Sequence, residues 1–193
     1  MDGAGQTAAG LPVAVIGAGP VGLAAAAQLL ERGIEPVILE AGDRVGTAVR
    51  DWGHVAMFSP WEFDIDRAAA ALLDRRGWAR PDPAAFPTGD DLASRYLEPL
   101  AATPEIASHL KLGARVTGVA RIRAGKVRTA GRSGLPFEVR HVDRHGREDR
   151  LFAQAVIDAS GTWGRPSPAG AGGLPAIGER AAASRIRYGM PDV

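Results

Sequence analysis

The 193-residue sequence predicts an α/β fold in which a parallel sheet is followed by an antiparallel β-meander. Val13–Ile16 and Pro36–Leu39 are short apolar runs of strand type, and the Ala- and Leu-rich stretch between them is of helix type. From Leu112 onward, segments that alternate apolar and polar residues are separated by Gly-rich turns, as in antiparallel strands. A last apolar run at residues 155–159 predicts a buried strand that returns to the parallel sheet.

A glycine motif joins the first predicted strand to the helix. Residues 17–22 read GAGPVG and fit the pattern G-x-G-x-x-G. Gly17 allows a sharp turn out of the strand, Gly19 lets the backbone approach a pyrophosphate, and Gly22 lets the helix pack close to the sheet. The N-terminus of the helix also offers unpaired N–H groups to phosphates. The motif therefore predicts a βαβ dinucleotide-binding unit; the alternative is a glycine cluster at a helix turn that binds no ligand.

Glu40 stands at the end of the second predicted strand, about twenty residues after the motif. A carboxylate at this place can accept hydrogen bonds from both ribose hydroxyls of a dinucleotide, and it would repel a 2′-phosphate. We therefore expect FAD or NAD at this site and not NADP.

Composition limits the partners that we expect. The net charge is +1, so nucleic acid and membrane surfaces are not expected partners. The chain has no cysteine, which removes disulfides, cysteine metal sites and thiol catalysis. Residues 11–30 are uncharged, but glycines and a proline interrupt them and no basic residue precedes them, so we expect neither a membrane span nor a signal peptide. Cytoplasmic localisation is the default expectation.

Aromatic residues gather after the second predicted strand: Trp52, Phe58, Trp61 and Phe63, with His54 among them. They predict either the lining of a pocket for a flat ring system or a small satellite core under a long loop. We expect His54 to be a hydrogen-bonded structural residue, since the sequence identifies no catalytic partner for it.

Two helices are predicted next, at residues 66–78 and after the N-cap candidate Thr88. The Tyr-x-x-x-Lys pair of short-chain dehydrogenases is absent after both tyrosines. An ordinary NAD dehydrogenase domain would continue to alternate strands and helices, so the insertion of an aromatic loop, two helices and a meander argues against that class.

The meander is expected at residues 114–122, 126–131 and 136–143, and it leads through residues 147–160 into the last strand. Many arginines lie in these segments, interspersed with acidic residues. We expect them to form a solvated sheet face and not a basic binding patch.

The GAGPVG motif, Glu40, the meander and the stretch VIDASGTWGRP together resemble the FAD-binding half of flavoproteins with two dinucleotide domains. The likeness is strongest to flavin-containing monooxygenases and related FAD-dependent oxidoreductases, and it covers residues 11–193. It implies a Rossmann-like FAD-binding domain, with NAD(P)H as co-substrate of the full-length protein and a small-molecule substrate that the sequence does not identify. Family chemistry would be hydride transfer from NADPH to FAD, followed by reaction of reduced flavin with oxygen.

The resemblance also implies which residues bind the cofactor. The glycine motif would bind the FAD pyrophosphate, Glu40 would bind the adenosine ribose, and the backbone at Val116 would meet the adenine. Gly46 and Thr47 would lie on the segment that leads toward the flavin, and residues 159–161 would pass near the cofactor and cross toward the NADPH domain. The implied set is Gly17, Ala18, Gly19, Pro20, Val21, Gly22, Glu40, Ala41, Arg44, Gly46, Thr47, Val116, Ala159, Ser160 and Gly161. No catalytic residue and no metal ligand is named.

The sequence departs from the family pattern in several places. The monooxygenase fingerprint F-x-G-x-x-x-H is absent, no cysteine pair follows Gly46, and no second G-x-G-x-x-G occurs. We therefore expect a flexible tail at residues 1–10, an FAD/NAD(P)-binding domain at 11–165, and a Gly/Pro-rich tail at 166–193 that leads to a missing NAD(P)H domain. The partner would be that domain or a second copy of the chain. The alternatives are a non-catalytic or split-enzyme module that needs a partner chain, and an NAD-dependent dehydrogenase domain.

Overall fold

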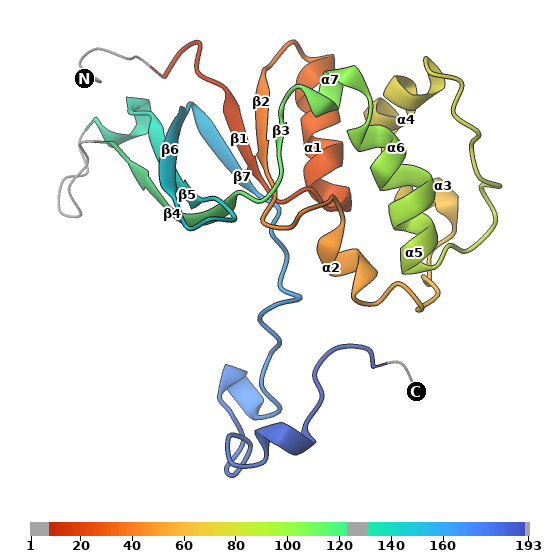
Figure 1. Cartoon of the computed structure of the whole chain (residues 1–193), viewed down its shortest axis with the longest axis vertical. Coiled ribbons are helices and arrows are strands. Elements are labelled where there is room, and N and C mark those ends of the chain that lie inside the picture. The colour runs from red at the N-terminus through yellow and green to blue at the C-terminus, as the bar shows by residue number, and fades with distance from the viewer. Residues whose placement is uncertain (1–7, 123–130, 192–193) are drawn as a thin grey trace.

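A four-stranded parallel sheet forms the centre of the molecule, with strand order β3-β2-β1-β7. The computed structural model describes residues 8–122 and 131–191, so most of the expected tail and the expected strand from Lys126 lie outside the described residues. The strands are β1 (Val13–Ile16), β2 (Pro36–Leu39), β3 (Leu110–Lys111) and β7 (Ala155–Asp158), and β1 pairs in parallel with both β2 and β7 (Figure 1). The α/β fold class is confirmed.

Helix α1 (Pro20–Glu31) connects β1 to β2 and covers one face of the sheet. Its buried residues are small except for Leu23, so the helix can lie close to the strands. The helix ends before Gly33, whose φ of +68° takes the chain into the left-handed region and back toward β2. The predicted βαβ unit is therefore present.

Short helices form a layer beside α1 (Figure 1). They are α2 (Thr47–Arg50), α3 (Trp61–Asp64), α4 (Arg67–Asp74), α5 (Gly89–Leu92), a π-helical turn (Ala93–Leu97), α6 (Glu98–Ala101) and α7 (Pro104–Ala107). Both predicted helices occur, although the first ends at Asp74, and Thr88 is the N-cap that we expected for the second. The Asp66 carboxylate accepts from two amides at the start of α4, and Thr88 forms a reciprocal capping box with Asp91.

The aromatic stretch divides between the interior and the surface. Trp61 is 1% exposed and belongs to the main core, whereas Phe58 and Phe63 are 95% and 76% exposed. Trp52 is half-buried, and His54 is exposed. The stretch therefore forms neither one pocket lining nor one satellite core.

An antiparallel sheet of β4 (Arg115–Arg121), β5 (Phe137–Val142) and β6 (Glu148–Ala153) lies on the side of the parallel sheet away from α1 (Figure 1). Side-chain alternation in β1 and β2 explains the three layers. Val15 and Ile38 point into the core beneath α1, whereas Ala14 and Leu39 pack with the meander. The predicted meander is confirmed for the described strands.

The last strand is less buried than we expected. Ala155, Val156 and Ile157 of β7 are only half-buried, and Asp158 is exposed. The reason is that β7 pairs with β1 on one side and has no strand on its other side among the described residues. Solvent therefore reaches the side chains of β7 from its open edge.

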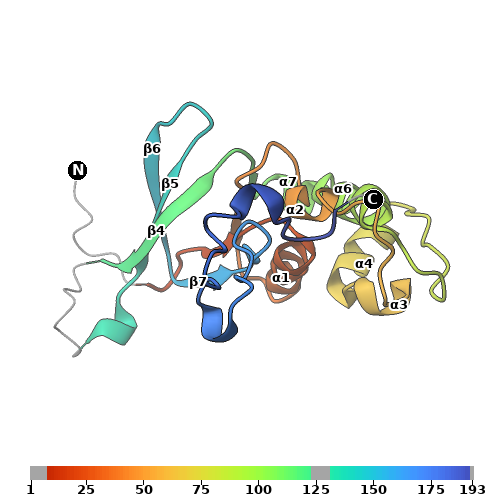
Figure 2. The ribbon, with the colours of Figure 1, turned by 90° about the horizontal axis from the view of Figure 1, so that it is seen from below.

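Residues 159–191 leave the sheet and form loop structure with two short 3₁₀ turns, Ala171–Gly173 and Ala183–Arg185 (Figures 1 and 2). Glu179 organises this segment. Its carboxylate is largely buried and accepts from the amides of Ala169 and Ala176 and from the hydroxyl of Tyr188. Over residues 8–122 and 131–191, no helix is long and apolar enough to cross a bilayer.

Candidate dinucleotide-binding site

The carboxyl ends of β1, β2 and β7 meet at one edge of the parallel sheet, where open α/β sheets bind ligands. Gly17 follows β1 with φ of +97°, and a Cβ at this position would lie 2.7 Å from the carbonyl oxygen of Ala159. Only glycine allows this turn and this approach. The first glycine of the motif therefore brings the ends of β1 and β7 into direct backbone contact.

The other two motif glycines have separate roles at the start of α1. A Cβ on Gly22 would lie 2.0 Å from the carbonyl oxygen of Gly17, so Gly22 is required for the helix to meet the strand. A Cβ on Gly19, by contrast, would have no heavy atom within 4 Å, and Gly19 lines a cavity. The open space lies next to the first N–H groups of α1, which have no partner within the helix. This backbone surface suits a phosphate group.

The Glu40 carboxylate joins two loops of the site. It is 9% exposed, its Oε2 accepts from the amide of Ala18 at 2.7 Å, and its Oε1 accepts from the amide of Gly42 at 2.8 Å. The carbonyl of Ala18 in turn accepts from the amide of Gly46 at 3.0 Å. Each carboxylate oxygen keeps a further lone pair for a ligand hydroxyl. Glu40 thus holds the motif in place and remains able to bind ribose.

Two adjoining cavities follow this edge of the sheet. The first has a volume of about 240 Å³ and lies between the start of α1, α2 and residues 159–161. The second has a volume of about 480 Å³ and lies between the ends of β1, β2 and β7 and the start of β4. Gly17, Glu40, Ser160 and Gly161 line both, so the two cavities form one groove.

The structure brings most of the predicted residues to this groove. Those that line it are Gly17, Gly19, Pro20, Val21, Glu40, Ala41, Gly46, Thr47, Val116, Ala159, Ser160 and Gly161. Ala18 and Gly22 lie behind the surface and act through backbone packing and hydrogen bonds. Arg44 is exposed and lines neither cavity; its carbonyl accepts from the Thr47 hydroxyl at 2.9 Å.

Several lining residues were not predicted, among them Trp52, Thr117, Asp158 and Arg165. Asp158 could have been found, because it is the last residue of the strand beside β1. Its Oδ1 accepts from the hydroxyl of Ser160 at 2.6 Å and from the Ser160 amide at 3.1 Å. These bonds, with a smaller contribution from nearby Arg165, hold the pKa of Asp158 below its usual range.

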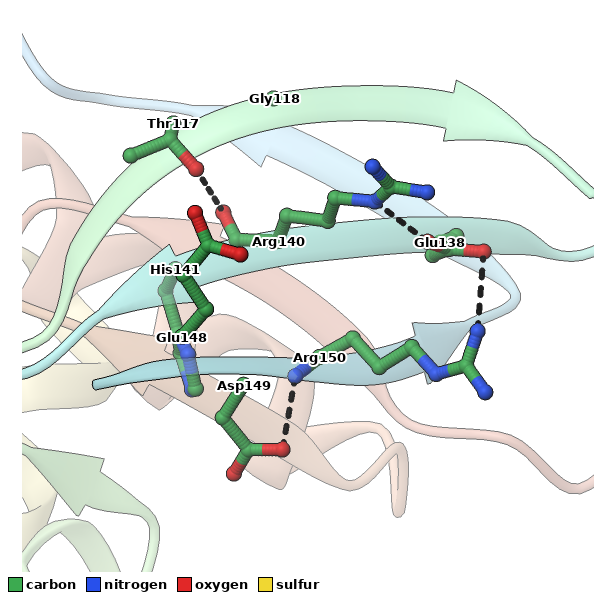
Figure 3. A pocket seen from close by; sticks show the side chains of 8 residues that line it. All are labelled: Thr117, Gly118, Glu138, Arg140, His141, Glu148, Asp149 and Arg150. Atoms are coloured by element: carbon green, nitrogen blue, oxygen red, sulfur yellow. Dashed lines mark hydrogen bonds and ion pairs between the residues drawn. The ribbon is translucent and has the colours of Figure 1, made fainter.

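A third cavity of about 540 Å³ lies along the antiparallel sheet (Figure 3). Its cationic side chains are neutralised locally. Glu138 accepts from Nε of Arg140 at 2.6 Å and lies 3.8 Å from Arg150. The acid between the two arginines supports the expectation of a solvated sheet face. His141 is buried below this face, and its Nδ1 has no hydrogen-bond partner within residues 8–122 and 131–191.

Comparisons with known proteins agree with this geometry. A family described as NAD(P)-binding Rossmann-like domain matches residues 15–80. No curated protein matches the sequence. The part of the chain from β1 through α4 therefore resembles a dinucleotide-binding Rossmann-like domain.

Solved structures resemble a larger part of the chain. Bacillithiol disulfide reductase from Bacillus cereus is 23% identical with a TM-score of 0.61, over 82% of this chain and 42% of that one. A flavin-containing monooxygenase from Stenotrophomonas maltophilia is 29% identical with a TM-score of 0.53, over 80% and 39%. OTEMO, in complex with FAD and NADP, is 20% identical with a TM-score of 0.56, over 79% and 26%. The chain spans less than half the length of these proteins, and it resembles portions of flavoprotein oxidoreductases.

Proposed function

We propose that this chain is the FAD-binding part of an NAD(P)H-dependent flavoprotein oxidoreductase of the monooxygenase-like type. The observation that carries the proposal is the groove of two adjoining cavities with Glu40 at their junction and the start of α1 on one wall. A ligand with a central pyrophosphate and an adenosine at one end matches the order of groups along the groove, which runs from the backbone N–H groups of α1 through the Glu40 carboxylate to the start of β4.

The residues of the groove suggest how such a ligand would be held. The pyrophosphate would lie against Gly19 and the first amides of α1, and the ribose hydroxyls would donate to Glu40. The adenine would lie along β4 beside Val116. The rest of the ligand would extend toward Thr47, where Trp52 offers an aromatic surface. Bound FAD would supply the redox chemistry, and these residues would orient it.

Two observations favour FAD over NAD. The helices and the meander are inserted between β2 and β7, which an ordinary NAD dehydrogenase domain does not require. The flavin-containing monooxygenase from Stenotrophomonas maltophilia is also similar to 80% of the chain. The match to an NAD(P)-binding family makes NAD the competing ligand.

Calorimetric titration of the purified chain with FAD, NAD and NADP tests the proposal. We expect FAD to bind more tightly than NAD and both to bind more tightly than NADP, since Glu40 would repel a 2′-phosphate. Glu40→Gln should weaken FAD binding, and Glu62→Gln, on the exposed side of α3, serves as the matched control. Tighter binding of NAD than of FAD would overturn the assignment.

A second candidate is a dinucleotide-binding module that acts together with a separate chain. The observation in its favour is that the similar structures are more than twice as long as the part matched here. This candidate predicts little or no NADPH oxidation by the FAD-loaded chain alone. Robust turnover by the isolated chain would rule it out.

A further inference from the structure

A hydrogen bond between residues far apart in the sequence crosses one end of the groove. Nε1 of Trp163 donates to Oδ2 of Asp51 at 2.9 Å, over a separation of 112 residues. Asp51 directly follows α2, and Trp163 lies five residues beyond β7. The bond therefore connects the segment after β7 to the helical layer.

The two ends of this bond adjoin opposite walls of the 240 Å³ cavity. Trp52, the neighbour of Asp51, lines the cavity beside Thr47 and Val49. On the other wall, Ser160 and Gly161 line it just before Trp163. At the floor of the site, the second wall already touches the turn between β1 and α1, where Gly17 meets the carbonyl of Ala159. The Trp163–Asp51 bond adds a second, outer connection to this wall, on the side of the helical layer.

A third segment covers the indole of Trp163. A Cβ on Gly189 would lie 2.8 Å from the ring, and Gly189 has φ of +90°. The backbone of Gly189 therefore lies against the six-membered ring of the half-buried indole. Packing on one side and the hydrogen bond on the other fix the orientation of the indole.

We propose that Trp163 and Asp51 form a clasp that sets the width of the cavity, and so positions the pyrophosphate and the adjoining part of a bound dinucleotide. This inference rests on the proposed function. Both are positioning residues, since neither lines the cavity itself. The clasp fixes Ser160 and Gly161 opposite the start of α1, so that these residues lose less conformational entropy when the ligand binds.

Four variants test the clasp. Asp51→Ala removes the acceptor, Trp163→Phe removes the donor, and Asp51→Asn keeps an acceptor oxygen. Trp78→Phe is the matched control, because the Trp78 indole also donates at 2.9 Å, to the carbonyl of Arg95, and lines neither cavity of the groove. FAD affinity is measured for each variant and for the Asp51→Ala/Trp163→Phe double variant. Indole N–H resonances in NMR spectra of the ligand-free proteins report the bond directly.

We expect Asp51→Ala and Trp163→Phe each to weaken FAD binding about threefold to tenfold. The FAD affinity of the double variant should equal that of the single variant with the lower affinity, because both changes remove the same bond. Asp51→Asn should restore affinity to within about twofold of the wild type. In the ligand-free spectra, Asp51→Ala should move the Trp163 resonance and leave that of Trp78 in place.

Three results would overturn the clasp: unchanged affinity in both single variants, additive losses in the double variant, or a Trp163 resonance that Asp51→Ala does not move. Failure of the proposed function is a different result, because the wild type would then bind no FAD. The positioning role would fall with it, while the NMR spectra would still show whether the bond exists.

Discussion

Replacing Glu40 with Gln separates the role that the structure gives to this side chain from the role that we propose for it. The carboxylate joins two loops of the ligand-free protein through the amides of Ala18 and Gly42, and it lines the groove where we propose that the ribose binds. Gln has nearly the same shape, but one of its two terminal atoms is an NH₂ donor. That donor must face one of the two backbone N–H groups.

The expected size follows from these contacts. A hydrogen bond to a charged group contributes about 1.5–3 kcal/mol, and a buried donor left unpaired costs about 1–3 kcal/mol. Glu40 is 9% exposed, so solvent can compensate only part of this loss. We therefore expect Glu40→Gln to lower the free energy of unfolding by about 2–3 kcal/mol and to weaken FAD binding about tenfold or more.

Two assays separate the roles. Urea denaturation of the ligand-free protein measures the scaffold role, and FAD titration at a temperature where the variant is folded measures the ligand role. An unchanged free energy of unfolding would contradict the described hydrogen bonds. Lower stability with unchanged FAD affinity would show that Glu40 supports the loops but does not contact the ribose.

Three further predictions concern the scaffold of the protein. Gly22→Ala should destabilise the protein by about 2 kcal/mol or more, measured by urea denaturation, because its Cβ would lie 2.0 Å from the carbonyl oxygen of Gly17. Burial raises the pKa of Tyr96 to about 12, so between about pH 10 and 12 the unfolded chain loses a proton that the native protein keeps. The free energy of unfolding should therefore fall by about 2–3 kcal/mol as pH rises through this window. Tyr96→Phe should abolish this part of the pH dependence, measured by denaturation at a series of pH values. Ser160→Ala should raise the pKa of Asp158 in an NMR titration, since the hydrogen bond from the Ser160 hydroxyl is the main cause of its lowered value. In the wild type, the stability that this hydrogen bond contributes is lost as pH falls through the lowered pKa. An unchanged pKa of Asp158 in the variant would contradict the hydrogen bond.

The sequence was sufficient for the parts of the fold that local patterns determine. The motif glycines, the helix after them and Glu40 follow each other at the spacing of a βαβ unit, and the structure places them at one sheet edge. The cap at Thr88 could be predicted because its hydroxyl bonds to an amide only three residues away. Most candidate site residues belong to these local patterns.

The remaining features depend on contacts between distant segments. Strand β3 has two residues, which is too short for a period to be visible. Trp61 and Phe58 are both aromatic and only three residues apart, so the packing of distant core residues around Trp61 alone makes the difference between them. The Trp163–Asp51 bond spans 112 residues and leaves no local pattern.

The absorption spectrum of the protein after incubation with FAD and desalting tests the central claim most directly. Our account predicts a flavin spectrum that stays with the wild-type protein and is weakened or lost in Glu40→Gln. A colourless wild-type protein that binds NAD in a parallel titration would contradict the FAD assignment and would place the chain among NAD-binding domains.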